Sequence, residues 1–235
     1  AGRALDLERA HDRAVREPVE GPESDAPDSV PESLVNTPPG PLVHGLTAGE
    51  MAQFVNASLA KPARLTVVPM KGWRRNMTWA DTGRPWVPPS PNLRTPEAAL
   101  VYPGTALVEG TNASEGRGTE TPFLLIGAPW LKAEAVIPTL PASGVEFEAT
   151  TFTPEASPAA PEPKHAGVPC AGIHVTVKDP AAVTPYKLGV ALLVALKGQT
   201  GFEWVRGGAG LDRLVGTKKL RAAIDRGDPV DAVVA

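Results

Sequence analysis

The spacing of apolar residues along the chain predicts several short helices. The clearest begins at Thr184-Pro185 and ends at Gly198, with hydrophobic residues at helical spacing along one side. This stripe consists of Leu188, Ala191, Leu192, Ala195 and Leu196. The run Thr47-Ala48-Gly49-Glu50 has the pattern of a capping box, and Thr95-Pro96 is typical of a helix start. Two further helices are expected over residues 131–140, interrupted at Pro138, and over residues 217–227.

Runs of alternating or β-branched residues between these helices predict strands. They cover residues 64–69, 122–128, 145–152 and 172–177. In the last of them Ile173, Val175 and Val177 alternate with His174 and Thr176. Because strands and helices alternate irregularly and no internal repeat is present, the expected fold class is α+β, or mixed α/β.

The first 40 residues differ from the rest in charge and in proline content. They hold nine acidic and four basic residues, and prolines at positions 18, 22, 27 and 31 exclude a continuous helix. We predict an extended Pro/acid-rich segment over residues 1–40 and a C-terminal α+β domain over residues 41–235. Asp228-Pro229 is typical of another helix start, so we expect that the chain is cut short at Ala235.

Composition excludes several classes of function. The formal net charge of −3 argues against a dedicated nucleic-acid binder. The longest apolar run, residues 188–196, is far shorter than the about 20 residues that a bilayer requires, so no transmembrane segment is expected. Cys170 is the only cysteine, which excludes an intrachain disulfide. The four histidines lack metal-ligand spacing, so we expect neither a metal ion nor a cofactor.

Two stretches contain residues that suit a binding site. Residues 71–96 are rich in proline and hold Trp73, Trp79 and Trp86, a composition that suits either a packed cover over a small core or the wall of a carbohydrate site. Residues 109–119 combine three glycines with carboxylates, a guanidinium, an amide and hydroxyls. They form either a ligand site with a carboxylate as acid or base, or an ordinary turn held by a Glu–Arg pair.

A series of six motifs resembles one known family in order and spacing. The motifs are Lys71-Gly72-Trp73-Arg74-Arg75, the run from Asp81 to Asn92, Tyr102-Pro103-Gly104-Thr105, the stretch from Glu109 to Thr119, Gly127-Ala128-Pro129-Trp130, and Lys164-His165-Ala166-Gly167. The series resembles the bacterial peptidoglycan exo-β-N-acetylmuramidases, which are glycoside hydrolases. The resemblance implies removal of N-acetylmuramic acid from the non-reducing end of peptidoglycan fragments. It also implies an N-terminal Rossmann-like domain, a C-terminal α+β domain and an active site in the cleft between them.

The resemblance covers the C-terminal domain and only the end of the N-terminal one. A Glu-containing motif of the family's N-terminal part has no counterpart in this chain. The Asp-Arg-Pro-Asn-Pro-like motif that ends one strand in the family is reduced to His11-Asp12-Arg13-Ala14. Val43 precedes His44-Gly45, where the family usually has an Arg. Two hypotheses therefore stay open. Either a second polypeptide with the Rossmann-like domain completes an enzyme, or the chain is a non-catalytic, muropeptide-binding or structural subunit of a cell-envelope assembly.

Glu115 and Glu109 are the candidate catalytic residues, because glycosidases usually place two carboxyl groups at the bond that they cleave. Glu115, between Ser114 and Gly116, is expected to sit on the more open backbone and to contact the substrate, whereas Glu109 either joins it or braces the turn. The candidate substrate-binding residues are Arg117, Asn112, Ser114, Trp73, Arg74, Arg75, Trp86, Asn92, His44 and His165.

The lactyl carboxylate of N-acetylmuramic acid requires a positive group, for which Arg suits better than Lys. We expect Arg117, Arg74 or Arg75 to supply it, unless Arg117 only pairs with a neighbouring glutamate. The expected partners are peptidoglycan-derived sugars. Because such fragments occur in the bacterial cell envelope, a periplasmic or secreted location is expected, with the cytoplasm as the alternative for a recycling enzyme.

Overall fold

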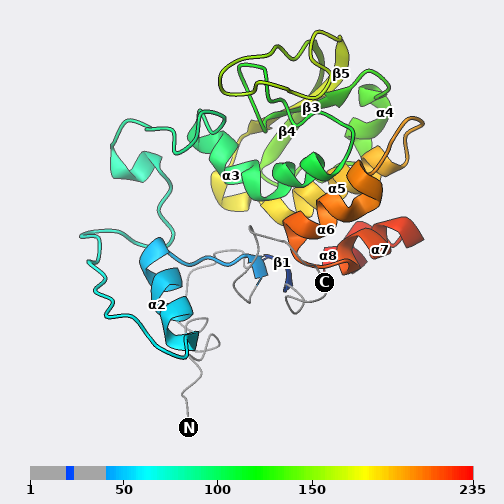
Figure 1. Cartoon of the computed structure of the whole chain (residues 1–235). Coiled ribbons are helices and arrows are strands. Elements are labelled where there is room, and N and C mark those ends of the chain that lie inside the picture. The colour runs from blue at the N-terminus through cyan, green and yellow to red at the C-terminus, as the bar shows by residue number, and fades with distance from the viewer. Residues whose placement is uncertain (1–19, 24–40, 235) are drawn as a thin grey trace. The chain divides into compact units, whose positions relative to one another are not determined.

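The computed structural model of the chain describes residues 20–23 and 41–234 (Figure 1). The rest of the extended segment predicted over residues 1–40, including the motif at residues 11–14, lies outside the described residues. Among the described residues, 44–84 belong to one compact unit, and 20–23, 41–43 and 85–234 belong to another, larger one. The polar motif at residues 109–119 lies in the larger unit.

The larger unit contains a three-stranded antiparallel sheet in the order β3-β5-β4. Its strands are β3 (Leu125–Ala128), β4 (Val145–Phe152) and β5 (Cys170–Val177). The central strand β5 pairs with β4 over its whole length, with Val145 opposite Val177, and with β3 on its other side. The strands predicted over residues 145–152 and 172–177 are confirmed, and the one predicted over 122–128 is confirmed in its second half.

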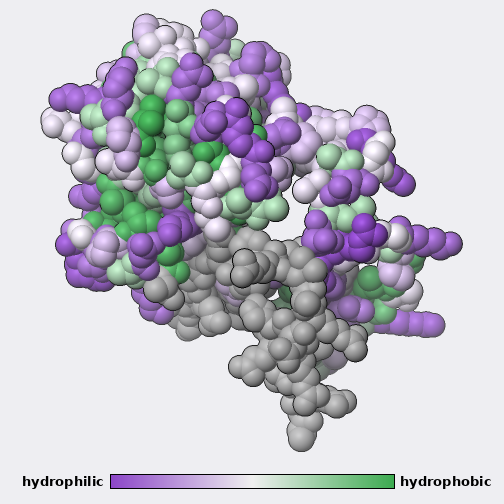
Figure 2. All heavy atoms as spheres, turned by 180° about the vertical axis from the view of Figure 1, so that it is seen from behind, coloured by the Kyte–Doolittle hydropathy of each residue, from purple (hydrophilic) through white to green (hydrophobic). Residues whose placement is uncertain are grey.

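Helix α5 (Pro185–Lys197) passes through the middle of the larger unit and is buried on two sides. Leu188, Leu192 and Leu196 pack in the core that contains the sheet. Tyr186, Val190 and Leu193 pack with α6 (Ala209–Val215) and α7 (Lys219–Arg226). Figure 2 shows the opposite face of the molecule, where hydrophilic side chains surround hydrophobic patches of the larger unit.

Shorter elements complete the larger unit. They are β1 (Glu20–Glu23) paired with β2 (Pro41–Val43), α3 (Pro96–Thr105), α4 (Ala133–Val136), α8 (Val230–Val234), and the 3-10 turns η2 (Ala106–Gly110), η3 (Ile137–Thr139), η4 (Pro180–Ala182) and η5 (Val205–Gly208). The mixture of helices with two small antiparallel sheets among the described residues confirms the α+β class. None of the described helices has the length and apolarity needed to cross a membrane.

The smaller unit is built around α2 (Ala48–Ser58), with a 3-10 turn η1 (Ala80–Thr82) farther along the chain. The predicted capping box is confirmed, because the Glu50 backbone N–H donates to the Thr47 hydroxyl at 3.2 Å and the Thr47 N–H donates to the Glu50 carboxylate at 2.8 Å. These two hydrogen bonds satisfy backbone donors that a helix start otherwise leaves without partners.

The strand predicted over residues 64–69 is wrong. The segment forms no strand, and neither sheet of the described part of the chain includes it. Two of its apolar side chains are exposed, Leu65 at 42% and Val68 at 84%. Alternating β-branched residues favour an extended backbone, but a strand also requires a hydrogen-bonded neighbour.

Helices α3 and α5 approach each other closely through two glycines. A Cβ atom added at Gly104 would lie 1.7 Å from the Pro185 carbonyl oxygen, and one added at Gly189 would lie 2.4 Å from the Gly104 carbonyl oxygen. We therefore expect Gly104→Ala to lower the free energy of unfolding by about 1–3 kcal/mol or more, the usual cost of overpacking. Urea denaturation measures the change.

Gly198→Ala is the matched control, because a Cβ there would meet its nearest atom at an ordinary 3.5 Å and the backbone φ is −73°. It is expected to change the free energy of unfolding by about 0.5 kcal/mol at most. Equal losses for the two variants would contradict the close packing of α3 on α5.

Candidate active site

The turn after η2 is fixed by the sheet beside it. The Ser114 N–H donates to the Gly127 carbonyl at 2.7 Å, and the Gly127 N–H donates back at 3.0 Å, so this turn pairs with the end of β3. The Phe123 N–H donates to the Glu115 carbonyl at 2.7 Å. Gly116 follows with φ +81°, and a Cβ there would lie 2.5 Å from the Leu125 carbonyl oxygen. Only glycine fits this position, so the backbone that follows Glu115 can pack directly against β3.

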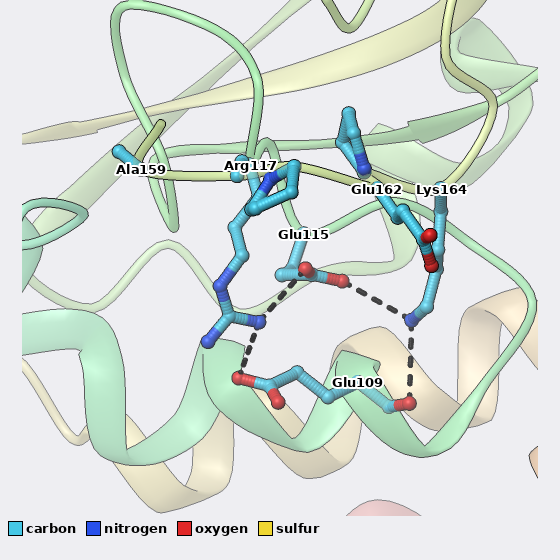
Figure 3. Close-up of a pocket in the computed structure, with 9 residues that line it drawn as sticks. Glu109, Glu115, Arg117, Ala159, Glu162 and Lys164 are labelled. Carbon is cyan, nitrogen blue, oxygen red and sulfur yellow. Dashed lines mark hydrogen bonds and ion pairs between the residues drawn. The ribbon is translucent and has the colours of Figure 1, made fainter. Parts of the chain in front are cut away.

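One arginine joins the two candidate carboxylates. Arg117 Nη1 lies 2.9 Å from a carboxylate oxygen of Glu109 and 2.9 Å from one of Glu115 (Figure 3). The nearest oxygens of the two glutamates are therefore separated by no more than twice that distance. The Arg117 guanidinium also lies 4.9 Å from the centre of the Phe123 ring, which stacks edge-on against Tyr102. Phe123 has φ 67°, a backbone conformation that is unusual for a bulky residue and that only surrounding packing can maintain.

Lys164 contacts Glu115 from the side opposite to Arg117 (Figure 3). Its Nζ lies 3.1 Å from Glu115 Oε2. The same nitrogen donates to the backbone carbonyls of Val108 and Glu109 at 3.2 Å each and of Ala113 at 2.9 Å. Both oxygens of the Glu115 carboxylate thus face a cation.

These side chains line a pocket of about 360 Å³. Its other wall is formed by the loop between β4 and β5, through Ala159, Ala160, Pro161, Glu162 and Pro163. The volume lies within the range of about 300–1,000 Å³ that is typical of small-molecule sites. Three carboxylates and two cations line it, together with the alanines and prolines of the loop.

The surroundings move the pKa values of the two glutamates in opposite directions. Burial raises the pKa of Glu109, and the nearby Glu115 adds to this rise, while Arg117 opposes it. Burial also acts on Glu115, but Lys164 and Arg117 together outweigh it and lower the pKa of that carboxyl. Two neighbouring carboxyls with separated pKa values can serve as a proton donor and a fixed negative charge.

The expectation that Glu115 sits on the more open backbone is wrong, because Ser114, Glu115 and Gly116 are all buried. The Glu115 side chain is 5% exposed, whereas that of Glu109 is 26% exposed. The small neighbours Ser114 and Gly116 suggested an open backbone, but they allow the turn to pack directly against β3. Lys164 then covers the carboxylate from the far side of the pocket.

Four other predicted binding residues hold the backbone around the pocket. Asn112 binds the loop at residues 201–203, through its amide to the Gly201 carbonyl at 2.7 Å and through its oxygen from the Glu203 N–H at 3.0 Å. The Ser114 hydroxyl is buried and accepts from the Gly116 N–H. His165 Nε2 lies 2.8 Å from the Asn112 carbonyl oxygen, and Asn92 donates to the Ala159 carbonyl at 2.8 Å. Direct contact of these residues with a sugar stays a prediction.

The remaining predicted residues make contacts within their own units. The Trp86 indole N–H donates to the Leu93 carbonyl at 3.1 Å, also in the larger unit. In the smaller unit, Arg75 binds Glu50 and lies 5.2 Å from the Trp73 ring centre, and the Arg74 N–H contacts the Met77 sulfur. His44 Nδ1 accepts from the Leu46 N–H. Their roles in binding stay predictions.

Sequence reasoning did not select Lys164 or the wall at residues 159–163. Lys164 belongs to one of the six motifs, which was a usable signal, but only its neighbour His165 was selected from that motif. Apart from Glu162, the wall consists of alanine and proline, which carry no chemical signal. Within the part of the chain that the structure describes, no three His, Cys, Asp or Glu residues gather as a metal site would require.

Comparison with known proteins identifies the family. The C-terminal model of the exo-β-N-acetylmuramidase NamZ matches residues 100–235, and its N-terminal model matches residues 12–97. The two matches divide the chain between residues 97 and 100, and the boundary expected at residue 40 stays a prediction. The peptidoglycan β-N-acetylmuramidase NamZ of Bacillus subtilis (strain 168) is 41% identical over 207 residues, which are 86% of this chain and 48% of that protein. The chain thus spans about half the length of this relative.

Two crystal structures of DUF1343 family proteins from Bacteroides fragilis NCTC 9343 have a similar fold. One has a TM-score of 0.74 at 24% identity and the other 0.69 at 28% identity. Each comparison covers 92% of this chain and, respectively, 57% and 56% of the other protein. The two family matches and the identity to the Bacillus subtilis protein confirm the resemblance that the six motifs indicated. The chain belongs to the NamZ family of exo-β-N-acetylmuramidases.

Proposed function

We propose that this chain carries part of the active site of a glycoside hydrolase that releases N-acetylmuramic acid from the non-reducing end of peptidoglycan fragments. The similarity to a Bacillus subtilis protein named as a peptidoglycan β-N-acetylmuramidase supports the substrate class. The observation that carries the proposal is the pocket in which Glu109 and Glu115 share Arg117 while their pKa values move apart. Such a pair can provide a proton donor and a fixed negative charge, two of the groups that hydrolysis of a glycosidic bond uses.

Glu109 is the proton donor in this proposal. Its raised pKa keeps a proton available for the leaving oxygen of the sugar, and it is the more exposed of the two carboxyls. Glu115 supplies a permanent negative charge, which favours the positively charged, oxocarbenium-like transition state. Arg117 lies between Glu109 and Glu115, so these two carboxyls do not face each other across the bond. The second carboxyl that flanks the bond therefore comes from the rest of the N-terminal domain, which a longer chain or a second polypeptide provides.

Arg117 has room for a second role in substrate binding. Its contacts with Glu109 and Glu115 both use Nη1, so neither contact uses the donors at Nε and Nη2. A planar guanidinium can bind a carboxylate with two parallel hydrogen bonds. We propose that these donors bind the lactyl carboxylate of N-acetylmuramic acid. We also propose that the enzyme acts in the bacterial cell envelope, where peptidoglycan fragments occur.

Product analysis tests the proposed function. The chain is extended to the length of its relatives with the N-terminal part of one of them, and this completed protein is incubated with the disaccharide that has N-acetylmuramic acid at its non-reducing end. We expect free N-acetylmuramic acid, detected by mass spectrometry. The disaccharide with N-acetylglucosamine at that end is the control and is expected to stay intact. Cleavage of the control alone, or binding of the substrate without cleavage, would overturn the proposal.

A further inference from the structure

Lys164 occupies a position that the proposed chemistry does not by itself explain. Its Nζ contacts four oxygens within 3.2 Å, namely the Glu115 carboxylate and the carbonyls of Val108, Glu109 and Ala113. The three carbonyls belong to the end of η2 and to the turn that follows it. An ammonium group has three N–H donors that can point in different directions, so it suits converging acceptors better than the flat fork of an arginine.

The contacts of Lys164 complete a closed ring. Arg117 connects the side chains of Glu109 and Glu115, and Lys164 connects the other Glu115 oxygen with the backbone of Glu109 (Figure 3). Lys164 reaches this ring from a loop that is 49 residues away from Glu115 along the chain. A ring closed by two cations restrains both the position of the Glu115 carboxylate and its distance from Glu109.

We propose that Lys164 is the positioning residue of this pocket: it ties the Glu115 carboxylate to the backbone of η2 and provides the positive charge that the far carboxylate oxygen faces. The positioning of Glu115 by Lys164 does not depend on the proposed function. Only the effect of Lys164 on turnover rests on that function. Lys164 acts through Glu115 and the backbone, so it need not touch the sugar.

The charges around Glu115 make the effect of Lys164 predictable. Glu115 faces Arg117 from its own turn, Lys164 from the loop between β4 and β5, and Glu109 from η2, and Glu162 lines the same pocket. After burial, which raises the pKa of Glu115, Lys164 is the strongest influence, and it lowers that pKa. An opposite charge at this distance usually lowers the pKa of a carboxyl by about 1–3 pH units.

Carbon-13 NMR of Glu-labelled protein tests the proposal without any need for enzymatic activity. The Glu115 carboxyl signal, assigned from its loss in Glu115→Gln, is followed through a pH titration of the present chain. In Lys164→Gln, which keeps N–H donors but removes the charge, we expect its midpoint to rise by about 1–3 pH units. In Lys164→Arg, which keeps the charge, the midpoint should stay near that of the wild type.

Lys178→Gln is the matched control, because Lys178 pairs with Glu146 at the exposed surface at a similar 2.9 Å. It should leave the Glu115 midpoint unchanged. If Lys164 only anchors carbonyl groups, Lys164→Gln will lower stability in urea without moving the Glu115 midpoint, and the proposal is overturned.

In the completed enzyme, Lys164→Gln should lower kcat with little change in KM. An inactive wild type would refute the proposed function but not the NMR result.

Discussion

Replacing Glu109 with Gln in the completed protein is expected to lower kcat for the disaccharide with N-acetylmuramic acid at its non-reducing end by about 100-fold or more, the scale of lost general acid catalysis. Glutamine cannot donate a proton to the leaving oxygen, yet it has nearly the same shape and retains an oxygen for Arg117. A 4-nitrophenyl β-glycoside of N-acetylmuramic acid has a leaving group that departs without protonation. With this substrate we expect Glu109→Gln to lose less than about 10-fold in kcat.

Glu115→Gln should behave differently, because Glu115 supplies charge and not a proton. We expect about 100-fold lower kcat with the disaccharide and a similar loss with the nitrophenyl substrate. Glu120→Gln is the control, since Glu120 is 93% exposed and pairs with Arg94 outside the pocket. A Glu109 variant with normal kcat on the disaccharide would remove Glu109 from the mechanism, and a normal Glu115 variant would do the same for Glu115.

The pH dependence of kcat should follow from the same two groups. The active form has Glu109 protonated, so the rate falls as pH rises through the raised pKa of Glu109. It also has Glu115 ionised, so the rate falls as pH drops through the lowered pKa of Glu115. The result is a bell-shaped profile, of which Glu109→Gln removes the alkaline side.

The present chain alone is expected to release no measurable N-acetylmuramic acid. It spans 48% of the Bacillus subtilis relative, and glycosidases usually need carboxyl groups on both sides of the bond. Its pocket contributes the wall that holds Glu109 and Glu115. Adding the rest of the N-terminal domain, either fused or as a separate polypeptide, should give turnover of the nitrophenyl substrate that is readily detected by absorbance.

The completed protein with Glu109 and Glu115 both replaced by Gln is the matched control for this experiment. It tests whether the activity that appears depends on the present chain or resides in the added part. Clear turnover by the lone chain would show that residues 1–235 contain every group that hydrolysis requires. In that case the site would not be divided between two domains.

Local sequence rules predicted the elements whose signals lie close together in the chain. The capping box at Thr47 and the helix of residues 185–197 are examples, because capping and apolar periodicity act over one or two turns. Helix α6 was missed, since glycines at positions 207, 208 and 210 are typical of a loop. Burial stabilises it instead: Leu211 is fully buried, and a Cβ at Gly110 would lie 2.8 Å from Leu211 Cβ.

In the candidate site, too, residues close together in the chain could be predicted, whereas contacts between distant segments could not. Glu109, Glu115 and Arg117 could be selected together because one short motif contains them, and the structure does bring them together. The burial of Glu115 could not be predicted, because it depends on β3 and on Lys164 from a distant loop. Spacing along the chain carries no information on such contacts until the sheet has brought the segments side by side.

The central claim is that one pocket moves the pKa values of two neighbouring glutamates in opposite directions. A carbon-13 NMR titration of the wild-type chain measures this directly, with each carboxyl signal assigned from its Gln variant. We expect the Glu109 signal to titrate above the ordinary Glu value of 4.5 and the Glu115 signal below it. The reverse order, or two midpoints that coincide near 4.5, would contradict the account.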